Sequence, residues 1–356
     1  MSGSLRRFFS APHPTRRGAE IVLLVALAAL LELAAGVGLA YVAGFSRVRA
    51  VLGDFDWPWL IALCGALALS FVGYYLAYQG IFRVDGGPRL SGRKMHAVVA
   101  AGFGGLLAHG GGALDRNALE AAGADEKEAK ARAAGLAGLE NGVLAIVGCV
   151  AAIAVLASVR AVPPADFTLP WAIIPIPAIL IGFWAAGRHW ERFYGRTGWR
   201  GALGIFLRSA HLIRELFTCP WPWGSALLGM ALFWAGDAFA VWTGLAAFGF
   251  RMDPAALVVG FATGMVFTRR TGPLAGAGIL ALALPVSLWY SGAPLAVAVA
   301  GVFAYRILVL WLPMPASLAL LPVLRGMVKH RIAQAAGAVP AGPPPRLGNA
   351  ARRETA

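Results

Sequence analysis

Six long apolar runs constrain this chain more than any other feature, because each can cross a bilayer as a helix of about 20 residues. They cover residues 19–44, 57–82, 135–158, 168–187, 221–248 and 293–321. Of the 356 residues, 59% are hydrophobic and 13% are charged, whereas soluble domains carry about 25% charged residues. The sequence therefore predicts an all-α polytopic membrane protein and excludes a pair of soluble domains.

Two further apolar segments, 95–119 and 255–290, are interrupted near their centres. Glycine and proline unwind helices, so each segment predicts two half-length helices joined by a break. The residues assigned to these breaks are Gly110, Gly111, Gly112, Gly272, Pro273, Gly276 and Gly278.

The distribution of basic residues decides how these broken segments relate to the membrane. The chain has a net charge of +14, and its basic excess falls in four places: before residue 20, at 83–94, at 188–219 and after 325. If both broken segments return to the side they came from, all four basic stretches lie on one side, as the positive-inside rule requires. We therefore expect six spans plus two re-entrant hairpins, with both termini cytoplasmic in a bacterial or archaeal plasma membrane.

The two hairpins then enter from opposite sides, as in an inverted repeat. Residues 97–103 (Ala-Val-Val-Ala-Ala-Gly-Phe) resemble 256–261 (Ala-Leu-Val-Val-Gly-Phe), and each precedes its break. Paired interrupted helices in inverted halves predict a substrate site near the bilayer midplane. The alternative is that Gly110 to Gly112 only permit close helix packing.

Ionisable residues inside spans mark the candidate site, since each is costly unless it is paired or hydrated. A surplus of arginine beside half-helix N-termini favours an anionic group such as phosphate. The predicted headgroup-binding residues are Arg116, Glu140, Asp237, Arg269, Arg270 and Arg306. Glu32 and Asp237 remain open between a structural ion pair and a role in ligand binding or proton transfer, and Arg306 needs a partner on another element.

The rest of the chain divides simply. Residues 1–18 form a basic N-terminal segment, 19–325 a single transmembrane domain, and 326–356 a basic tail predicted to be disordered. Residues 188–220 alternate aromatic and basic side chains, which predicts an amphipathic segment on the leaflet surface. Residues 115–132 carry both signs of charge, which predicts a solvated helix with a Glu126–Lys130 pair.

Several classes of ligand are excluded at this stage. The three cysteines (Cys64, Cys149 and Cys219) and six histidines lack the spacing of a metal site, so we expect no metal or other cofactor. The basic residues are scattered between apolar spans, which argues against nucleic acid as a partner.

Short motifs around the two breaks resemble the lysylphosphatidylglycerol synthase transmembrane (flippase-type) family. Residues 109–116 (His-Gly-Gly-Gly-Ala-Leu-Asp-Arg) and 138–141 (Gly-Leu-Glu-Asn) are similar to its Gly-x-x-x-Arg turn and later Glu-Arg step. Residues 271–278, and then Tyr305-Arg306 through Leu312-Pro313, are similar to its Pro-Gly-Gly-x-Gly turn and Tyr-Arg span. Asn141 stands where that family often has Arg, and Ile279 to Ala281 stand where it commonly has Glu.

The resemblance covers about residues 19–325 and implies a translocating half without the soluble aminoacyltransferase domain. It implies a transporter that moves a lipid with a phosphate-containing headgroup between leaflets, and the sequence leaves an enzymatic role open. An alternative from the residues is a polytopic lipid-linked glycosyltransferase that uses Asp54 and Asp56 of the first external loop. A third is a non-transporting membrane partner of a separate lipid-modifying enzyme.

Overall fold

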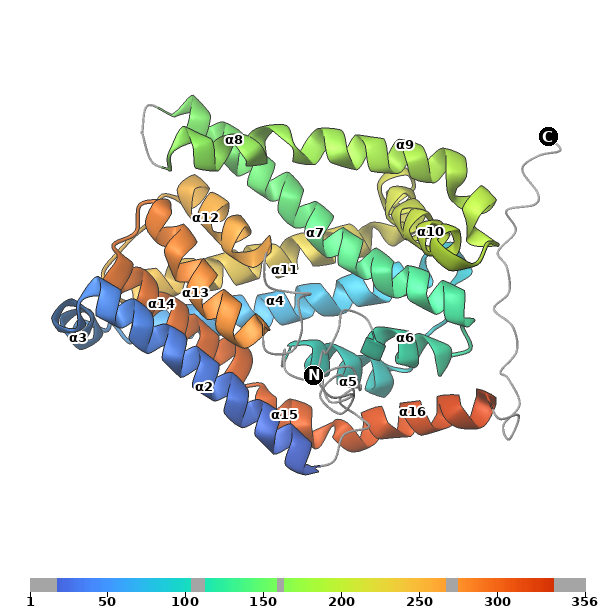
Figure 1. The fold of residues 1–356 in the computed structure, drawn as a ribbon, viewed down its shortest axis with the longest axis horizontal. Coiled ribbons are helices and arrows are strands. Elements are labelled where there is room, and N and C mark those ends of the chain that lie inside the picture. Colours follow the sequence, from blue (N-terminus) through green and yellow to red (C-terminus); the bar gives the residue numbers. More distant parts are fainter. Residues whose placement is uncertain (1–17, 104–112, 159–162, 267–274, 336–356) are drawn as a thin grey trace.

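The computed structural model describes residues 18–103, 113–158, 163–266 and 275–335, and every regular element in these ranges is helical (Figure 1). Six spans are long and apolar enough to cross a membrane. They are α2 (Gly18–Ala43), α4 (Pro58–Arg83), α7 (Glu126–Ala157), the pair α8 (Ala165–Ile173) and α9 (Pro175–Tyr194), α11 (Pro220–Ala246), and α14 (Leu295–Arg306) with the π-helix η3 (Ile307–Trp311). The predicted all-α polytopic fold is confirmed.

Both interrupted segments form pairs of helices that are too short to cross a bilayer singly. The first pair is α5 (Gly92–Phe103) and α6 (Ala113–Glu120), and the second is α12 (Pro254–Val266) and α13 (Ala275–Tyr290). In Figure 1, α3 (Phe45–Gly53) and α8 lie at the left, and α6 and α10 (Gly198–Thr218) at the right. Helix α4 runs from α3 at the left to the right, and α7 runs from the right back to α8 at the left. The first hairpin connects α4 to α7, so it begins and ends at the right. The second begins and ends at the left, between α11 and α14, so the hairpins are re-entrant and enter from opposite ends.

The order of elements repeats along the chain. A span, a short connecting helix, a second span, a hairpin and a third span appear as α2, α3, α4, α5–α6 and α7. The same order returns as α8–α9, α10, α11, α12–α13 and α14, except that the connecting helix α10 has 21 residues where α3 has 9. Because each unit holds three spans, the second unit starts on the opposite side from the first, which makes the repeat inverted. The similar stretches 97–103 and 256–261 fall on the equivalent helices α5 and α12.

The second spans of the two units, α4 and α11, cross in close backbone contact. A Cβ added at Gly73 would lie 2.4 Å from the main-chain nitrogen of Phe233, and one at Gly236 would lie 2.6 Å from the main-chain oxygen of Ala66. Small residues let helix backbones approach in membranes, where van der Waals packing provides most of the association energy. The second spans of the two units therefore pack directly on each other, backbone to backbone.

We expect Gly73→Leu to destabilise the protein by about 3 kcal/mol or more, because leucine would overpack a backbone contact that cannot move alone. Gly65→Leu is the matched control on the same helix, since nothing lies within 4 Å of a Cβ at Gly65. Its effect should stay within about 0.5 kcal/mol. Unfolding titrations in detergent micelles measure both, and equal losses would contradict the packing account.

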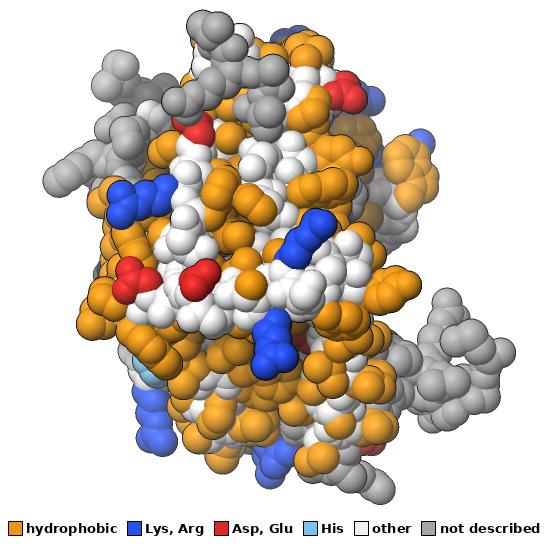
Figure 2. All heavy atoms as spheres, turned by 90° about the vertical axis from the view of Figure 1, so that its left-hand side faces the viewer, with side chains coloured by type: hydrophobic (Ala, Val, Ile, Leu, Met, Phe, Trp, Pro, Cys, Tyr) orange, Lys and Arg blue, Asp and Glu red, His pale blue; other side chains and the backbone are white. Residues whose placement is uncertain are grey.

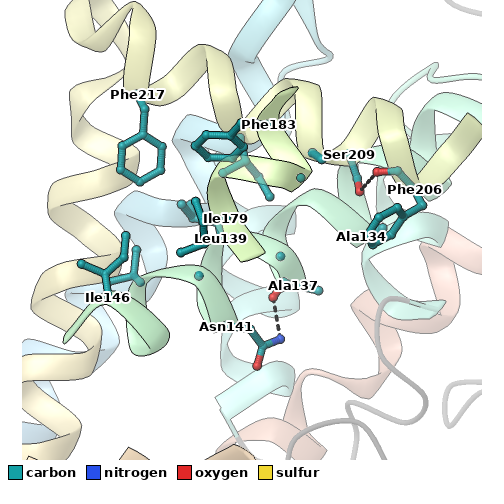
Figure 3. A pocket seen from close by; sticks show the side chains of 16 residues that line it. Ala134, Ala137, Leu139, Asn141, Ile146, Ile179, Phe183, Phe206, Ser209 and Phe217 are labelled. Carbon is teal, nitrogen blue, oxygen red and sulfur yellow. Dashed lines mark hydrogen bonds between the residues drawn. The ribbon is translucent and has the colours of Figure 1, made fainter. Parts of the chain in front are cut away.

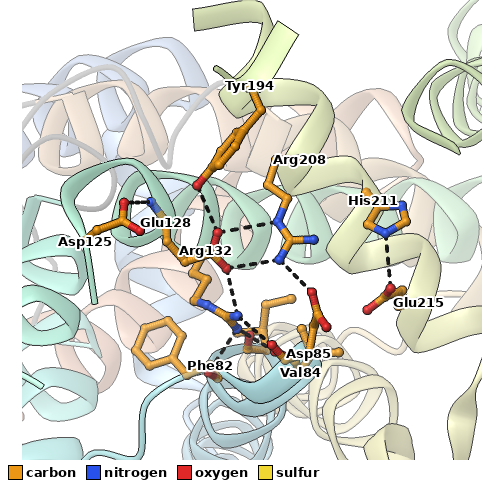
Figure 4. A network of polar contacts seen from close by, with 11 residues as sticks. Phe82, Val84, Asp85, Asp125, Glu128, Arg132, Tyr194, Arg208, His211 and Glu215 are labelled. Atoms are coloured by element: carbon orange, nitrogen blue, oxygen red, sulfur yellow. Dashed lines mark hydrogen bonds and ion pairs between the residues drawn. The ribbon is translucent and has the colours of Figure 1, made fainter. Parts of the chain in front are cut away.

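A polar network joins the end of α4, the start of α7 and the middle of α10 (Figure 4). Arg132 of α7 is 2% exposed and donates to the carbonyls of Phe82 at 3.0 Å and Val84 at 2.7 Å, and its Nη2 lies 2.8 Å from Glu128. Arg208 of α10 contacts Asp85 at 2.7 Å and Glu128 at 3.3 Å. The network therefore satisfies the last carbonyls of α4, which helix geometry leaves without partners.

The structure adds detail to three predicted segments, of which 115–132 needs correction. Arg132 is buried, so 115–132 is not a solvated helix throughout, although the Lys130–Glu126 pair is present at 2.5 Å. Segment 188–220 comprises the end of α9 and the whole of α10, and α10 buries Arg208 and Ser209. The helix α16 (Leu321–Ala335) continues into the predicted tail, and residues 336–356 lie outside the described ranges.

Candidate functional site

Two carboxylates predicted for the site are deeply buried within the spans. Glu140 of α7 is 4% exposed and Asp237 of α11 is 1% exposed. Carboxylates in a bilayer are costly and concentrate along substrate or proton paths. Gly236 precedes Asp237 in the sequence, and because it has no side chain it allows α11 to approach α4 closely at this point.

Trp234 connects α7 and α11, the helices that carry Glu140 and Asp237. Its indole Nε1 donates a 2.8 Å hydrogen bond to the main-chain oxygen of Glu140, and Asp237 follows one helical turn later on α11. The Trp234 ring also meets Phe261 of α12 edge to face, with centroids 5.7 Å apart. The second hairpin therefore packs directly on the helices that carry Glu140 and Asp237.

The first hairpin contributes a third carboxylate, which the sequence interpretation did not include. The Tyr78 hydroxyl of α4 donates to Asp115 of α6, and Tyr78 also lies within electrostatic reach of Glu140. The signal that could have identified Asp115 was its position beside Arg116, directly after the glycine run. We name Tyr78, Asp115, Glu140, Trp234 and Asp237 the central cluster: the first four are joined by the contacts above, and Asp237 is included because it lies one helical turn from Trp234 on α11.

Arg116 follows Asp115 on α6, and its side chain contacts a residue of the same helix. Its Nε lies 3.6 Å from Glu120, one turn along, and its side chain is partly exposed. The guanidinium therefore lies at the edge of the central cluster, where its charge is shared with Glu120.

Arg306 belongs to a second buried group, formed by α2, α14 and the π-helix η3. Its Nε donates to Glu32 at 2.6 Å, and Trp311 Nε1 donates to the other oxygen of Glu32 at 2.8 Å. Arg306 thus has its partner on another element, as predicted, and Glu32 forms the interhelical pair that was one of its two interpretations. A π-helical turn directly after Arg306 is a local irregularity often found at functional sites.

Other predicted residues lie at or beyond the edges of the described ranges. Arg269, Arg270, Gly110, Gly111, Gly112, Gly272 and Pro273 lie outside them. Gly276 and Gly278 are helical, in the first turn of α13, so their assignment to the break needs correction. Gly278 instead faces α2, where its added Cβ would lie 3.6 Å from Leu31.

The acidic turn proposed for a glycosyltransferase is short. Asp54 and Asp56 are exposed between α3 and α4, and the main-chain nitrogen of Asp56 donates to the Ala247 oxygen at 2.8 Å. This hydrogen bond fixes the turn against the end of α11. Within the described ranges, no three His, Cys, Asp or Glu residues are grouped to hold a metal ion.

Comparisons with protein-family models, curated proteins and solved structures found no match for this chain. Any function assigned to the chain therefore depends on its own geometry.

Proposed function

We propose that this membrane protein is a translocase, which moves a lipid with a phosphate-containing headgroup between leaflets. The observation that carries the proposal is the inverted pair of half-length hairpins on either side of a buried central cluster. Discontinuous helices in inverted halves are the arrangement that transporters use to build a midplane site. The buried carboxylates on α7 and α11 support the proposal, because ionisable residues inside spans concentrate along substrate and proton paths.

The polarity of the hairpins favours an anionic substrate. Both α6 and α13 begin directly after the hairpin breaks, so each hairpin directs a helix N-terminus toward its tip. Helix N-termini carry partial positive charge and unpaired N–H groups that bind phosphate. Arg116 in α6, and Arg269 and Arg270 shortly before α13 in the sequence, add full positive charges. Of the two arginines considered for the phosphate, Arg306 is already paired with Glu32, so we assign the phosphate to Arg270.

The orientation follows from the charges at the two ends of the bundle. The end with α3 and α8 presents both signs of charge scattered among apolar side chains (Figure 2). The opposite end has the basic segments 83–94 and 188–219. The positive-inside rule supports placing that opposite end, and both termini, on the cytoplasmic side.

A variant test in proteoliposomes addresses the central cluster and the second break separately. We expect Asp237→Asn, and independently Arg269→Gln with Arg270→Gln, to slow headgroup translocation about tenfold or more, equivalent to about 1.4 kcal/mol on the barrier. Gly65→Leu serves as the control and should translocate at the wild-type rate. Wild-type rates in both site variants would overturn the site assignment.

A further inference from the structure

An apolar cavity of about 370 Å³ lies between α7, α9 and α10, lined by residues outside the central cluster (Figure 3). Its walls include Ile146, Ile179, Phe183 and Ile213. The polar side chains Ser209 and Asn141 bond to their own helices, to Phe206 O at 2.7 Å and to Ala137 O at 2.8 Å. The size suits a ligand, and the lining favours hydrocarbon.

This cavity lies on the membrane-facing side of the bundle. The α8–α9 span is the least buried of the six, and its α9 side chains Leu180, Ile181 and Trp184 are exposed. Phe206 and Phe217, which line the cavity from α10, are exposed as well. The molecules that reach such a surface in a bilayer are lipids, and their acyl chains match the apolar lining.

The cavity lies next to a concentration of unneutralised arginine. Helix α10 runs back along α9, with Phe217 beside Phe183 and His211 stacked on Trp190. Arg214 covers Gly187, whose added Cβ would lie 2.7 Å from the guanidinium, one turn beyond Phe183. Five arginines of this region form no ion pair with a carboxylate among the described residues. They are Arg188, Arg192, Arg196, Arg200 and Arg214.

We propose that this cavity is a binding site for an anionic membrane phospholipid, with one acyl chain between α7, α9 and α10 and the phosphate at Arg214. Charge and shape agree: the apolar volume adjoins Arg214, which lies one turn beyond Phe183, as chain and headgroup adjoin in the lipid. Arginine suits phosphate because its planar donors bind two oxygens together. This site would hold its lipid whether or not the protein translocates one.

Two glycines make the proposal testable without disturbing the fold. Gly142 and Gly182 both line the cavity, and nothing lies within 4 Å of a Cβ added at either. Leucine at these positions would project into the space assigned to the acyl chain. Gly65→Leu again provides the control, because its position is equally open and lies on α4, away from the cavity.

The experiment uses phosphatidylglycerol with a photoreactive diazirine in one acyl chain, diluted into phosphatidylcholine proteoliposomes that contain the full-length protein. Mass spectrometry of the crosslinked peptides should place the label mainly on residues 134–146 and 179–183. Gly142→Leu and Gly182→Leu should each lower that labelling about tenfold, which corresponds to a loss of about 1.4 kcal/mol. Gly65→Leu should leave it unchanged.

Arg214→Gln tests the headgroup part of the site. It should reduce labelling by the phosphatidylglycerol probe and leave the weaker labelling by a matched phosphatidylcholine probe unaltered. Label spread evenly over all lipid-facing spans, or unaffected by both leucine variants, would overturn the site. Equal labelling by the two probes would overturn the assignment of the phosphate to Arg214.

Discussion

Arg306→Met is expected to destabilise the protein by about 3–5 kcal/mol, because it leaves a buried carboxylate without its cation. Glu32 and Arg306 are each 4% exposed and lie 2.6 Å apart, far from the water that would solvate either charge alone. After the substitution, Glu32 would lose the hydrogen bond from Arg306 and keep the one from the Trp311 indole. Reversible unfolding in detergent micelles measures the loss.

The double variant Glu32→Gln with Arg306→Met tests whether Glu32 and Arg306 stabilise the protein as a pair or independently of each other. Removing the carboxylate charge should recover part of the stability lost in Arg306→Met, so the two effects should not add. Additive losses would show that the two side chains are not coupled and would contradict the pairing of α2 with α14.

Arg132→Met should have an effect of similar size, about 3–5 kcal/mol. It would remove the donors to Phe82 and Val84 and leave Glu128 with Arg208 as its cation. Burial lowers the pKa of Arg208. The negative charge of Glu128 and the hydrogen bonds to Asp85 and Glu128 raise it by more, so the pKa of Arg208 lies above its ordinary value. Arg208 therefore keeps its stabilising charge until the pH exceeds the usual range for arginine.

Lys130→Met is the matched control for Arg132→Met, two residues earlier on α7. Lys130 pairs with Glu126 at the surface, so its loss should change the stability by about 0.5 kcal/mol or less. Comparable losses in Lys130→Met and Arg132→Met would mean that the buried network contributes no more than a surface pair.

The spans, the hairpins and their inverted order could all be predicted from the sequence, because bilayer thickness and basic-residue bias act on local stretches of chain. The repeat was visible in residues 97–103 and 256–261, which lie on equivalent helices. The kink between α8 and α9 was not predicted, although Pro175 begins the second helix.

The burial of Arg132 and Arg208 was not predicted, because the partners of these arginines lie on elements that are distant in the sequence. Arg132 lies in segment 115–132, which was predicted to be solvated, but its carbonyl partners are Phe82 at the end of α4 and Val84 just after it. Its neighbour Arg208 comes from α10. Arg208 follows the periodicity of a surface helix and is buried for the same reason. Small neighbours such as Ala131, Ala133 and Gly135 were the local sign that this face of α7 is packed.

The central claim is tested most directly by the rate at which a fluorescent phosphatidylglycerol analogue crosses between leaflets of proteoliposomes. Dithionite added outside quenches the outer leaflet at once and the inner leaflet only as lipid crosses. We predict that the wild-type protein makes the inner-leaflet probe accessible far faster than in protein-free vesicles, with the lipid recovered chemically unchanged. A rate equal to that of protein-free vesicles, or consumption of the lipid, would contradict the proposal.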